Sequence, residues 1–177
     1  MNGSTPPPPA PPAGGNQQPG ALPPELRRAR YRDCHRQLEA VLAGEPDAIA
    51  RMSSALPLLL EVLPQASFVG FYRVLPGEVL VAGPYQGPLA CLRIRFGQGV
   101  CGAAAASGRS VLVADVDAFP GHIACDARAR SELVVPVRAA DGSLIAVLDL
   151  DSHQPEAFDA VDQEGCEALM TLIAADA

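Results

Sequence analysis

The sequence predicts an α+β fold in which a mostly antiparallel sheet is flanked by helices. Three observations favour this class. Strand-like segments come in pairs joined by short turns, as in antiparallel hairpins. Segments with helical periodicity lie near both ends of the chain, and a short alanine-rich segment lies in the middle. Hairpins outnumber the segments that could form strand–helix–strand units, which argues against a parallel sheet.

The first 24 residues differ in composition from the rest of the chain. They contain nine of the eighteen prolines and no charged side chain. Such a segment has too little apolar area to offset its ordering entropy, so residues 1–24 are predicted to be a disordered tail. Residues 25–177 are long enough for one domain that buries roughly two-thirds of its unfolded surface. No signal peptide and no run of membrane-spanning length is evident, so we expect no membrane association.

Three segments are predicted to be helical. The first helix is predicted over residues 25–43 and ends before Gly44. Its apolar stripe consists of Tyr31, Cys34, Leu38, Val41 and Leu42. Residues 46–63 predict a second helix, bent or divided at Pro57. The last helix is expected to begin near Asp159, a suitable N-cap, and to pack Val161, Leu169, Leu172 and Ile173.

The strands are expected between these helices. One hairpin joins residues 67–74 to residues 79–82 through Pro76 and Gly77. A second hairpin joins residues 132–137 to residues 144–150 through an Ala-Asp-Gly turn. Between the hairpins the sequence predicts, in order, a strand over 91–96, a brief alanine helix over 100–107 and a strand over 110–114.

Charge and cysteine content exclude some classes of protein. The net charge is −7, and all thirteen basic residues are arginine. Five arginines between residues 27 and 36 could suggest nucleic-acid binding, but the surrounding domain is acidic. A solvated helix face explains them better, and no nucleic-acid partner is expected. Five cysteines without a secretory signal favour the reducing cytoplasm over a disulfide scaffold.

Three cysteines are crowded into 35 residues: Cys91, Cys101 and Cys125. All lie near glycines at expected loops or helix starts, and none has the spacing of a zinc knuckle. Thiols accessible to solvent and to backbone amides are better explained by reactivity than by core packing. Cys34 and Cys166 lie on predicted helices, where a buried structural role is expected.

Reduction of a sulfoxide or peroxide by thiols has three requirements: an attacking thiolate, an acid and a second, resolving thiol. Cys125 is the best candidate nucleophile, because Arg128 and Arg130 follow it and could lower its pKa. His122 could also stabilise the thiolate, or it could be a loop residue bonded to backbone. Cys91 and Cys101 are candidate resolving cysteines, and either needs its Cα within about 4.4–6.8 Å of that of Cys125.

Acidic residues at the second hairpin are the candidate acids. Asp149 and Asp151 alternate with leucines, so both carboxylates project from one face of a strand, and Glu132 begins the neighbouring strand. Three such carboxylates repel one another unless a cation offsets them. A substrate ammonium group, an arginine or a metal ion would satisfy them, and a solvated strand end is the alternative. Crowding would also raise their pKa values, which suits proton donors.

One glycine motif resembles a dinucleotide-binding loop. Residues 97–102 match G-x-G-x-x-G, and Asp115 and Asp117 follow at a suitable distance. The predicted helix, however, ends at Gly108 after about two turns, and no further strand–helix–strand units follow. The glycines are therefore expected to let the backbone turn tightly around Cys101. No cofactor and no bound metal is expected.

Seven short segments form a recognisable series, at residues 69–72, 83–87, 90–91, 96–102, 119–126, 131–132 and 147–152. Together they closely resemble the free methionine-(R)-sulfoxide reductases, small stand-alone GAF-domain enzymes. The octapeptide Phe-Pro-Gly-His-Ile-Ala-Cys-Asp at residues 119–126 is the most specific of them. The resemblance implies a single GAF-like domain over residues 25–177.

The resemblance also implies roles for the cysteines. Cys125 would attack the sulfur of free methionine sulfoxide, release methionine and become a sulfenic acid. Cys91 would condense with it to a disulfide, which thioredoxin would reduce. Cys101 occupies the third cysteine position of the family and could be a second resolving thiol. Related enzymes form dimers, so a homodimer is expected.

Glu132, Asp149 and Asp151 match an acidic trio that holds the substrate amine and assists at the sulfoxide oxygen. Selectivity for free methionine sulfoxide would follow, because peptide-bound methionine lacks the ammonium group. Phe68 stands where the family usually has tryptophan, and with Tyr72 it is expected to enclose the substrate methyl group. The smaller ring predicts weaker substrate binding.

Two other classes of function remain open from the sequence. A non-catalytic GAF sensor would need no cysteine relay and is usually fused to an output domain, which we do not expect for a sequence that ends at Ala177. A metal-binding redox protein would use Cys91, Cys101, Cys125 and His122.

Overall fold

The computed structural model describes residues 22–173. The predicted tail, residues 1–24, lies outside the described residues except for its last three, and Pro24 begins the first helix. The elements follow in the order α1 (Pro24–Leu42), α2 (Ala48–Val62), β1 (Phe68–Leu75), β2 (Val79–Gln86), β3 (Arg93–Arg95), α3 (Gly99–Ser107), β4 (Val111–Val113), a short 3₁₀ helix η1 (Val116–Ala118), β5 (Ser131–Arg138), β6 (Leu144–Ser152) and α4 (Ala160–Ile173).

The six strands form one sheet in the order β3-β2-β1-β6-β5-β4, and all neighbours pair antiparallel. Both predicted hairpins are present, as β1–β2 and β5–β6. Their turns contain Gly77 and Gly142, each with a φ of 86° that favours glycine. The two hairpins meet where β1 pairs with β6, so the longest strands form the centre of the sheet. This arrangement confirms the predicted α+β class.

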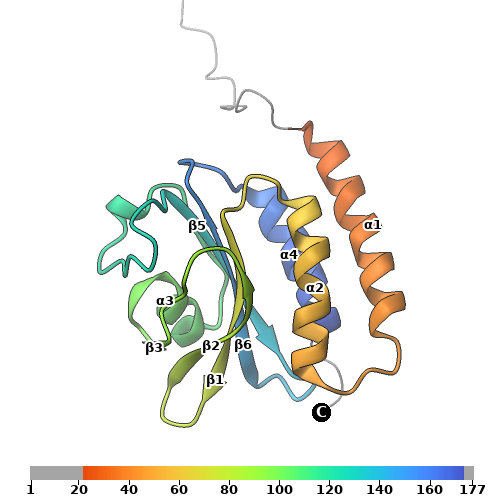
Figure 1. Ribbon diagram of the computed structural model, residues 1–177, viewed down its shortest axis with the longest axis horizontal. Helices are drawn as coiled ribbons and strands as arrows, with labels where there is room; N and C mark the ends of the chain where they lie inside the picture. Colours follow the sequence, from red (N-terminus) through yellow and green to blue (C-terminus); the bar gives the residue numbers. More distant parts are fainter. Residues whose placement is uncertain (1–21, 174–177) are drawn as a thin grey trace, which may run out of the picture.

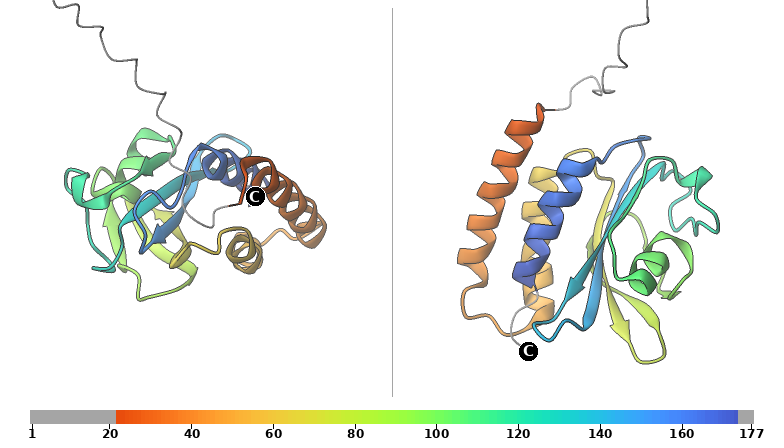
Figure 2. Two further views of the ribbon diagram at one scale, coloured as in Figure 1. Left: turned by 90° about the horizontal axis from the view of Figure 1, so that it is seen from above. Right: turned by 180° about the vertical axis from the view of Figure 1, so that it is seen from behind.

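The helices cover the two faces of the sheet unequally (Figures 1 and 2). Helices α2 and α4 pack on one face and α1 lies outside them, while α3 lies on the opposite face with the loops on either side of it. Strand residues alternate between the two faces. Leu133, Leu148 and Leu150 belong to the core beneath the helices, whereas Tyr72, Val134 and Val147 belong to a smaller core around α3.

The long helices differ from prediction in two details. Val41 is 61% exposed although Leu38 and Leu42 are buried, because it lies at the edge of the α1 stripe. Helix α2 is continuous from Ala48 to Val62, so the helix is not divided at Pro57, and a bend there stays a prediction.

The N-terminus of α4 is anchored to α1 by charge. Asp159 accepts hydrogen bonds from the backbone of Val161 and Asp162, which confirms it as the N-cap. Arg27 on α1 pairs with the carboxylates of both Asp159 and Asp162. None of the helices among residues 22–173 combines the length and apolarity needed to cross a bilayer.

Candidate active site

Strand register gathers the predicted carboxylates on the α3 face of the sheet. Glu132 on β5 lies directly opposite Asp151 on β6, and Asp151 lies opposite Phe68 on β1. Asp149 is two residues before Asp151, so it faces the same way, opposite Gly70. The prediction that Asp149 and Asp151 share one face is confirmed, and Glu132 joins them from the neighbouring strand.

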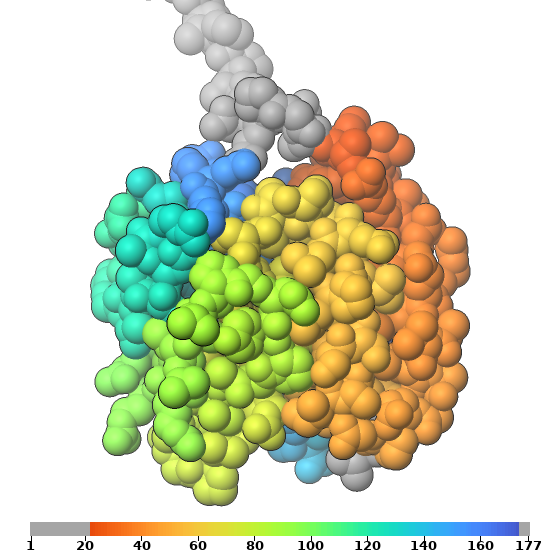
Figure 3. All heavy atoms as spheres, in the orientation of Figure 1, coloured from red at the N-terminus to blue at the C-terminus, as the bar shows by residue number. Residues whose placement is uncertain are grey.

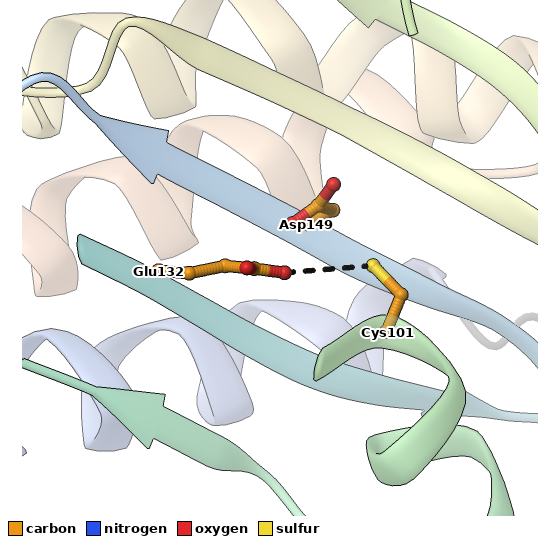
Figure 4. A group of neighbouring side chains, drawn as sticks. All are labelled: Cys101, Glu132 and Asp149. Atoms are coloured by element: carbon orange, nitrogen blue, oxygen red, sulfur yellow. Dashed lines mark hydrogen bonds between the residues drawn. The ribbon is translucent and has the colours of Figure 1, made fainter. Parts of the chain in front are cut away.

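Cys101 joins this group from the first turn of α3 (Figure 4). Its thiol donates to Glu132 Oε1 at 3.9 Å, and ligand atoms of Cys101, Glu132 and Asp149 lie within 4.8 Å of one another. All three side chains are buried. They are also the donor set from which a metal ion could take ligands, since sulfur and carboxylate oxygen both bind metals.

The glycines before Cys101 serve backbone packing. A Cβ on Gly102 would lie 2.4 Å from the carbonyl oxygen of Arg95, so only glycine lets α3 start this close to β3. Gly97 and Gly99 have φ values of 78° and 61°, in the left-handed region. These features support the interpretation of residues 97–102 as a tight turn around Cys101.

Burial makes the three carboxyl groups hard to ionise. It raises the pKa of Asp149 to about 6, and burial followed by the charge of Asp149 raises the pKa values of Glu132 and Asp151. Asp149 Oδ1 is buried and has no hydrogen-bond donor among the described residues. A buried acceptor of this kind is costly unless a ligand supplies the donor.

Two of the three clustered cysteines form a disulfide beside the acidic group. Cys91 and Cys125 are bonded with Cα atoms 5.3 Å apart, inside the predicted window. Cys125 is exposed, and it lines the same cavity as Glu132, Asp149 and Asp151. In the space-filling view the chain around residue 91 (green) and around residue 125 (turquoise) lies side by side (Figure 3).

The remaining cysteines are all buried. Burial, then the charge of Asp149, raises the pKa of Cys101. Its thiol is therefore less accessible than its position between glycines suggested. Cys34 and Cys166 are also buried, as predicted.

The charged neighbours of Cys125 are arranged differently from expectation. Arg128 pairs with Asp126 at 3.1 Å, and Arg130 lies near Asp115 and Asp117 at 3.9 and 3.6 Å. Both guanidinium groups therefore face carboxylates, because nearby acids compete for them. The hydrogen bond from Arg128 lowers the pKa of Asp126.

His122 and His153 approach the acidic residues. The Nε2 atom of His122 lies 3.8 Å from Glu132 Oε2, and its side chain lines the cavity. Its backbone N–H donates to the carbonyl oxygen of Phe119, as expected for a loop residue bonded to backbone, and stabilisation of the Cys125 thiolate by His122 stays a prediction. His153 contacts Asp126 at 2.9 Å, a partner that the sequence did not indicate.

Phe68 and Tyr72 lie on the same sheet face as the carboxylates and are buried. Phe68 stacks on Tyr85 with ring centroids 5.4 Å apart. Gly70 makes room for this stack, because a Cβ atom added at this position would lie 2.5 Å from Tyr85 Cβ and 2.9 Å from Phe68 Cζ. Burial, then the charge of Asp149, raises the pKa of Tyr72. The sequence missed Tyr85, although its place opposite Gly70 follows from the hairpin register.

The cavity beside the disulfide is small. Its volume of about 20 Å³ suits roughly one water molecule, whereas ligand pockets commonly reach about 300–1,000 Å³. Phe68 and Tyr72 are outside its lining. Residues that the sequence did not single out complete its wall, namely Ile94, Gln98, Ile123, Asp126 and Ala129. In the disulfide form, the thiols of Cys91 and Cys125 are not free to bind metal as the alternative metal site required.

Comparisons with known proteins agree with this geometry. The chain matches the family model described as a GAF domain over residues 50–175. It is 41% identical over 140 residues to a protein of Escherichia coli K12 named free methionine-R-sulfoxide reductase, a match covering 79% of this chain and 84% of that protein. A protein of the same name from Saccharomyces cerevisiae is 39% identical over 141 residues, 76% of this chain and 78% of that protein. The structure of free methionine-R-sulfoxide reductase from Neisseria meningitidis in complex with its substrate has a TM-score of 0.79 and 44% identity, and the match covers 84% of this chain and 88% of that one.

Proposed function

The chain belongs to the free methionine-R-sulfoxide reductases, a family of GAF-domain enzymes, and we propose that Cys125 and Cys91 carry its redox chemistry. The protein reduces free L-methionine (R)-sulfoxide to methionine. One observation carries the assignment of residues: the Cys91–Cys125 disulfide lies beside a buried acidic group. A non-catalytic sensor domain would need no such pair of cysteines.

Cys125 is the nucleophile. Its thiolate attacks the sulfoxide sulfur, and a carboxyl group delivers a proton to the oxygen. Methionine leaves, and the oxygen stays on Cys125 as a sulfenic acid. The raised pKa values of Glu132 and Asp151 support either residue as the proton donor, since each holds its proton at a higher pH than an exposed carboxyl group.

Cys91 is the resolving cysteine. Its thiol attacks the sulfur of the Cys125 sulfenic acid. The oxygen departs as water, and the Cys91–Cys125 disulfide forms. The disulfide between the two residues supports this pairing, and its Cα separation of 5.3 Å is ordinary for such a bond. Cys101 is less suited to resolve, since it is buried and its S–H is directed to Glu132.

The carboxylates bind the substrate ammonium group. The donor that Asp149 Oδ1 lacks is supplied by the ammonium, and Glu132 and Asp151 surround the same position. Peptide-bound methionine sulfoxide has no ammonium, so the site favours the free amino acid. Phe68 and Tyr72 are buried on the same sheet face outside the lining of the small cavity, and they form the apolar wall for the methyl group when the site opens to take the substrate.

We further propose thioredoxin as the reductant, a cytoplasmic location and a homodimer. Light scattering of the purified protein measures the assembly state.

Residues 25–177 form the enzyme domain, and removal of residues 1–24 leaves the activity intact. Methionine release by the truncated chain and by the full chain can be compared directly.

Methionine release from each separated sulfoxide epimer, with dithiothreitol as the reductant, tests the function. We expect turnover of the R epimer only, and none in Cys125→Ser. Turnover retained in Cys125→Ser would remove that residue from its role. Binding of sulfoxide without any methionine release by the wild type would favour the sensor alternative.

A further inference from the structure

The two most exposed large apolar side chains of the described residues lie next to the disulfide. Leu89 is 84% exposed and Leu92 is 78% exposed, and they stand two residues before and one residue after Cys91. Ile123, which is 39% exposed, stands two residues before Cys125. The other exposed large apolar side chains among residues 22–173 belong to α1, α2 and β4, namely Leu26, Val41, Ile49 and Leu112.

These three residues all lie close to the disulfide. Consecutive Cα atoms are about 3.8 Å apart, so Leu89 and Ile123 lie no more than about 8 Å from the Cα of their respective cysteine. The disulfide brings those two cysteines to a Cα distance of 5.3 Å. Figure 3 shows the corresponding green and turquoise segments in contact at the surface. Apolar area is thus concentrated around the bond that must be reduced in every turnover.

Two positive charges, unpaired among the described residues, lie beside this surface, on the Cys91 side. Arg93 and Arg95 follow Leu92 on the edge strand β3, and both side chains are exposed. Neither forms an ion pair within the part of the chain that the structure describes. The protein as a whole has a net charge of −7, so this basic edge is a local exception. A partner with an apolar contact area and acidic groups at its rim would complement it.

We propose that Leu89, Leu92 and Ile123 form the docking surface for the protein dithiol that reduces the Cys91–Cys125 disulfide. The proposal rests on the function proposed above, in which this disulfide is the product of each turnover. A small thiol such as dithiothreitol needs only access to sulfur. A protein dithiol must also seat its reactive cysteine against the surrounding surface, and burial of apolar side chains at the centre of an interface provides that affinity.

The two thiols of the partner supply the two electrons that reduce the Cys91–Cys125 disulfide. The partner thiolate attacks Cys91 Sγ, the sulfur that the leucines flank, which forms a mixed disulfide and releases the Cys125 thiolate. The second partner thiol, as its thiolate, then attacks the partner sulfur of the mixed disulfide and releases Cys91. Two electrons pass from the partner, which leaves as a disulfide, and the thiolates of Cys91 and Cys125 take up the protons that the partner thiols lose.

Paired reductant assays on a Leu89→Ser/Leu92→Ser double variant test the proposal. The substitution keeps the backbone hydrogen bond from Ala82 to Leu92, and neither side chain lines the cavity. With thioredoxin, thioredoxin reductase and NADPH we expect KM for thioredoxin to rise about tenfold or more, because the apolar area of two leucine side chains would no longer be buried in the interface. With dithiothreitol we expect turnover and KM for the sulfoxide within about twofold of wild type.

Leu26→Ser is the matched control, since Leu26 is 54% exposed on α1, away from the disulfide, and should change neither assay. An unchanged KM for thioredoxin in the double variant overturns the docking surface. An equal loss with dithiothreitol overturns it as well, because the leucines would then act within the site. A change of assembly state in the double variant would reassign the surface to contact between two copies of the chain. Failure of the wild type with dithiothreitol would instead refute the proposed function.

Discussion

Asp149→Asn should make the protein more stable while it weakens substrate binding. Burial raises the pKa of Asp149 to about 6 from an ordinary value of 3.8. By linkage, the ionised carboxylate therefore costs the folded state about 3 kcal/mol when the pH is well above 6. Below about pH 4 the group is protonated in both states and this cost is absent, so it develops as the pH rises from about 4 to 6.

Asparagine keeps the shape of the side chain and removes the charge. Its amide can donate to the neighbouring carboxylates, so most of the cost should disappear above pH 6. A domain of this size gains about 2–4 °C in Tm per kcal/mol, which predicts a rise of about 5–10 °C at pH 8. Little change is expected near pH 4. Thermal unfolding at the two pH values measures the difference.

The same substitution removes an acceptor for the substrate ammonium. A hydrogen bond to a charged group contributes about 1.5–3 kcal/mol, so KM for free methionine sulfoxide should rise about 10- to 150-fold. The dithiothreitol-driven release assay measures it. Asp33→Asn is the control, because Asp33 is an exposed carboxylate on α1 that pairs with Arg36. A fall in Tm at both pH values, or an unchanged KM, would refute this account of Asp149.

Three further substitutions probe other parts of the site. Phe68→Trp should lower KM for the sulfoxide, since a larger ring covers more of the substrate methyl group; an unchanged KM would show that the smaller ring is not limiting. Gly70→Ala should destabilise the protein by about 1–3 kcal/mol and raise KM, because the added Cβ meets Tyr85 and Phe68; urea unfolding with wild-type stability would contradict the close approach. Cys101→Ala should still form the Cys91–Cys125 disulfide after one turnover, as peptide mapping can show, and a free Cys91 would make Cys101 the resolving thiol.

Local patterns predicted the parts of this molecule that depend on neighbouring residues. The alternation of Asp149 and Asp151 with leucines placed both carboxylates on one face, and short turns between strand-like segments predicted both hairpins. Asp159 was identified as an N-cap because its partners are two and three residues away. In each case the interaction that determines the structure joins residues that are close together in the sequence.

Contacts between distant segments were harder to predict. The arginines after Cys125 looked able to stabilise its thiolate, but tertiary structure brings Asp115 and Asp117 to Arg130, and Arg128 turns to Asp126. Burial of Cys101 depends on how closely α3 approaches β3, which a glycine-rich segment alone does not reveal. The disulfide separation likewise depends on how the loop before β3 meets the loop before β5, and the sequence could only state the limit that the distance must satisfy.

Mapping of the cysteines after a single turnover tests the central claim most directly. Fully reduced protein is mixed with excess free methionine (R)-sulfoxide without reductant, then alkylated and digested for mass spectrometry. We predict one methionine released per chain and a disulfide between Cys91 and Cys125, with Cys34, Cys101 and Cys166 alkylated. Methionine release that leaves Cys125 alkylated as a free thiol would contradict the mechanism.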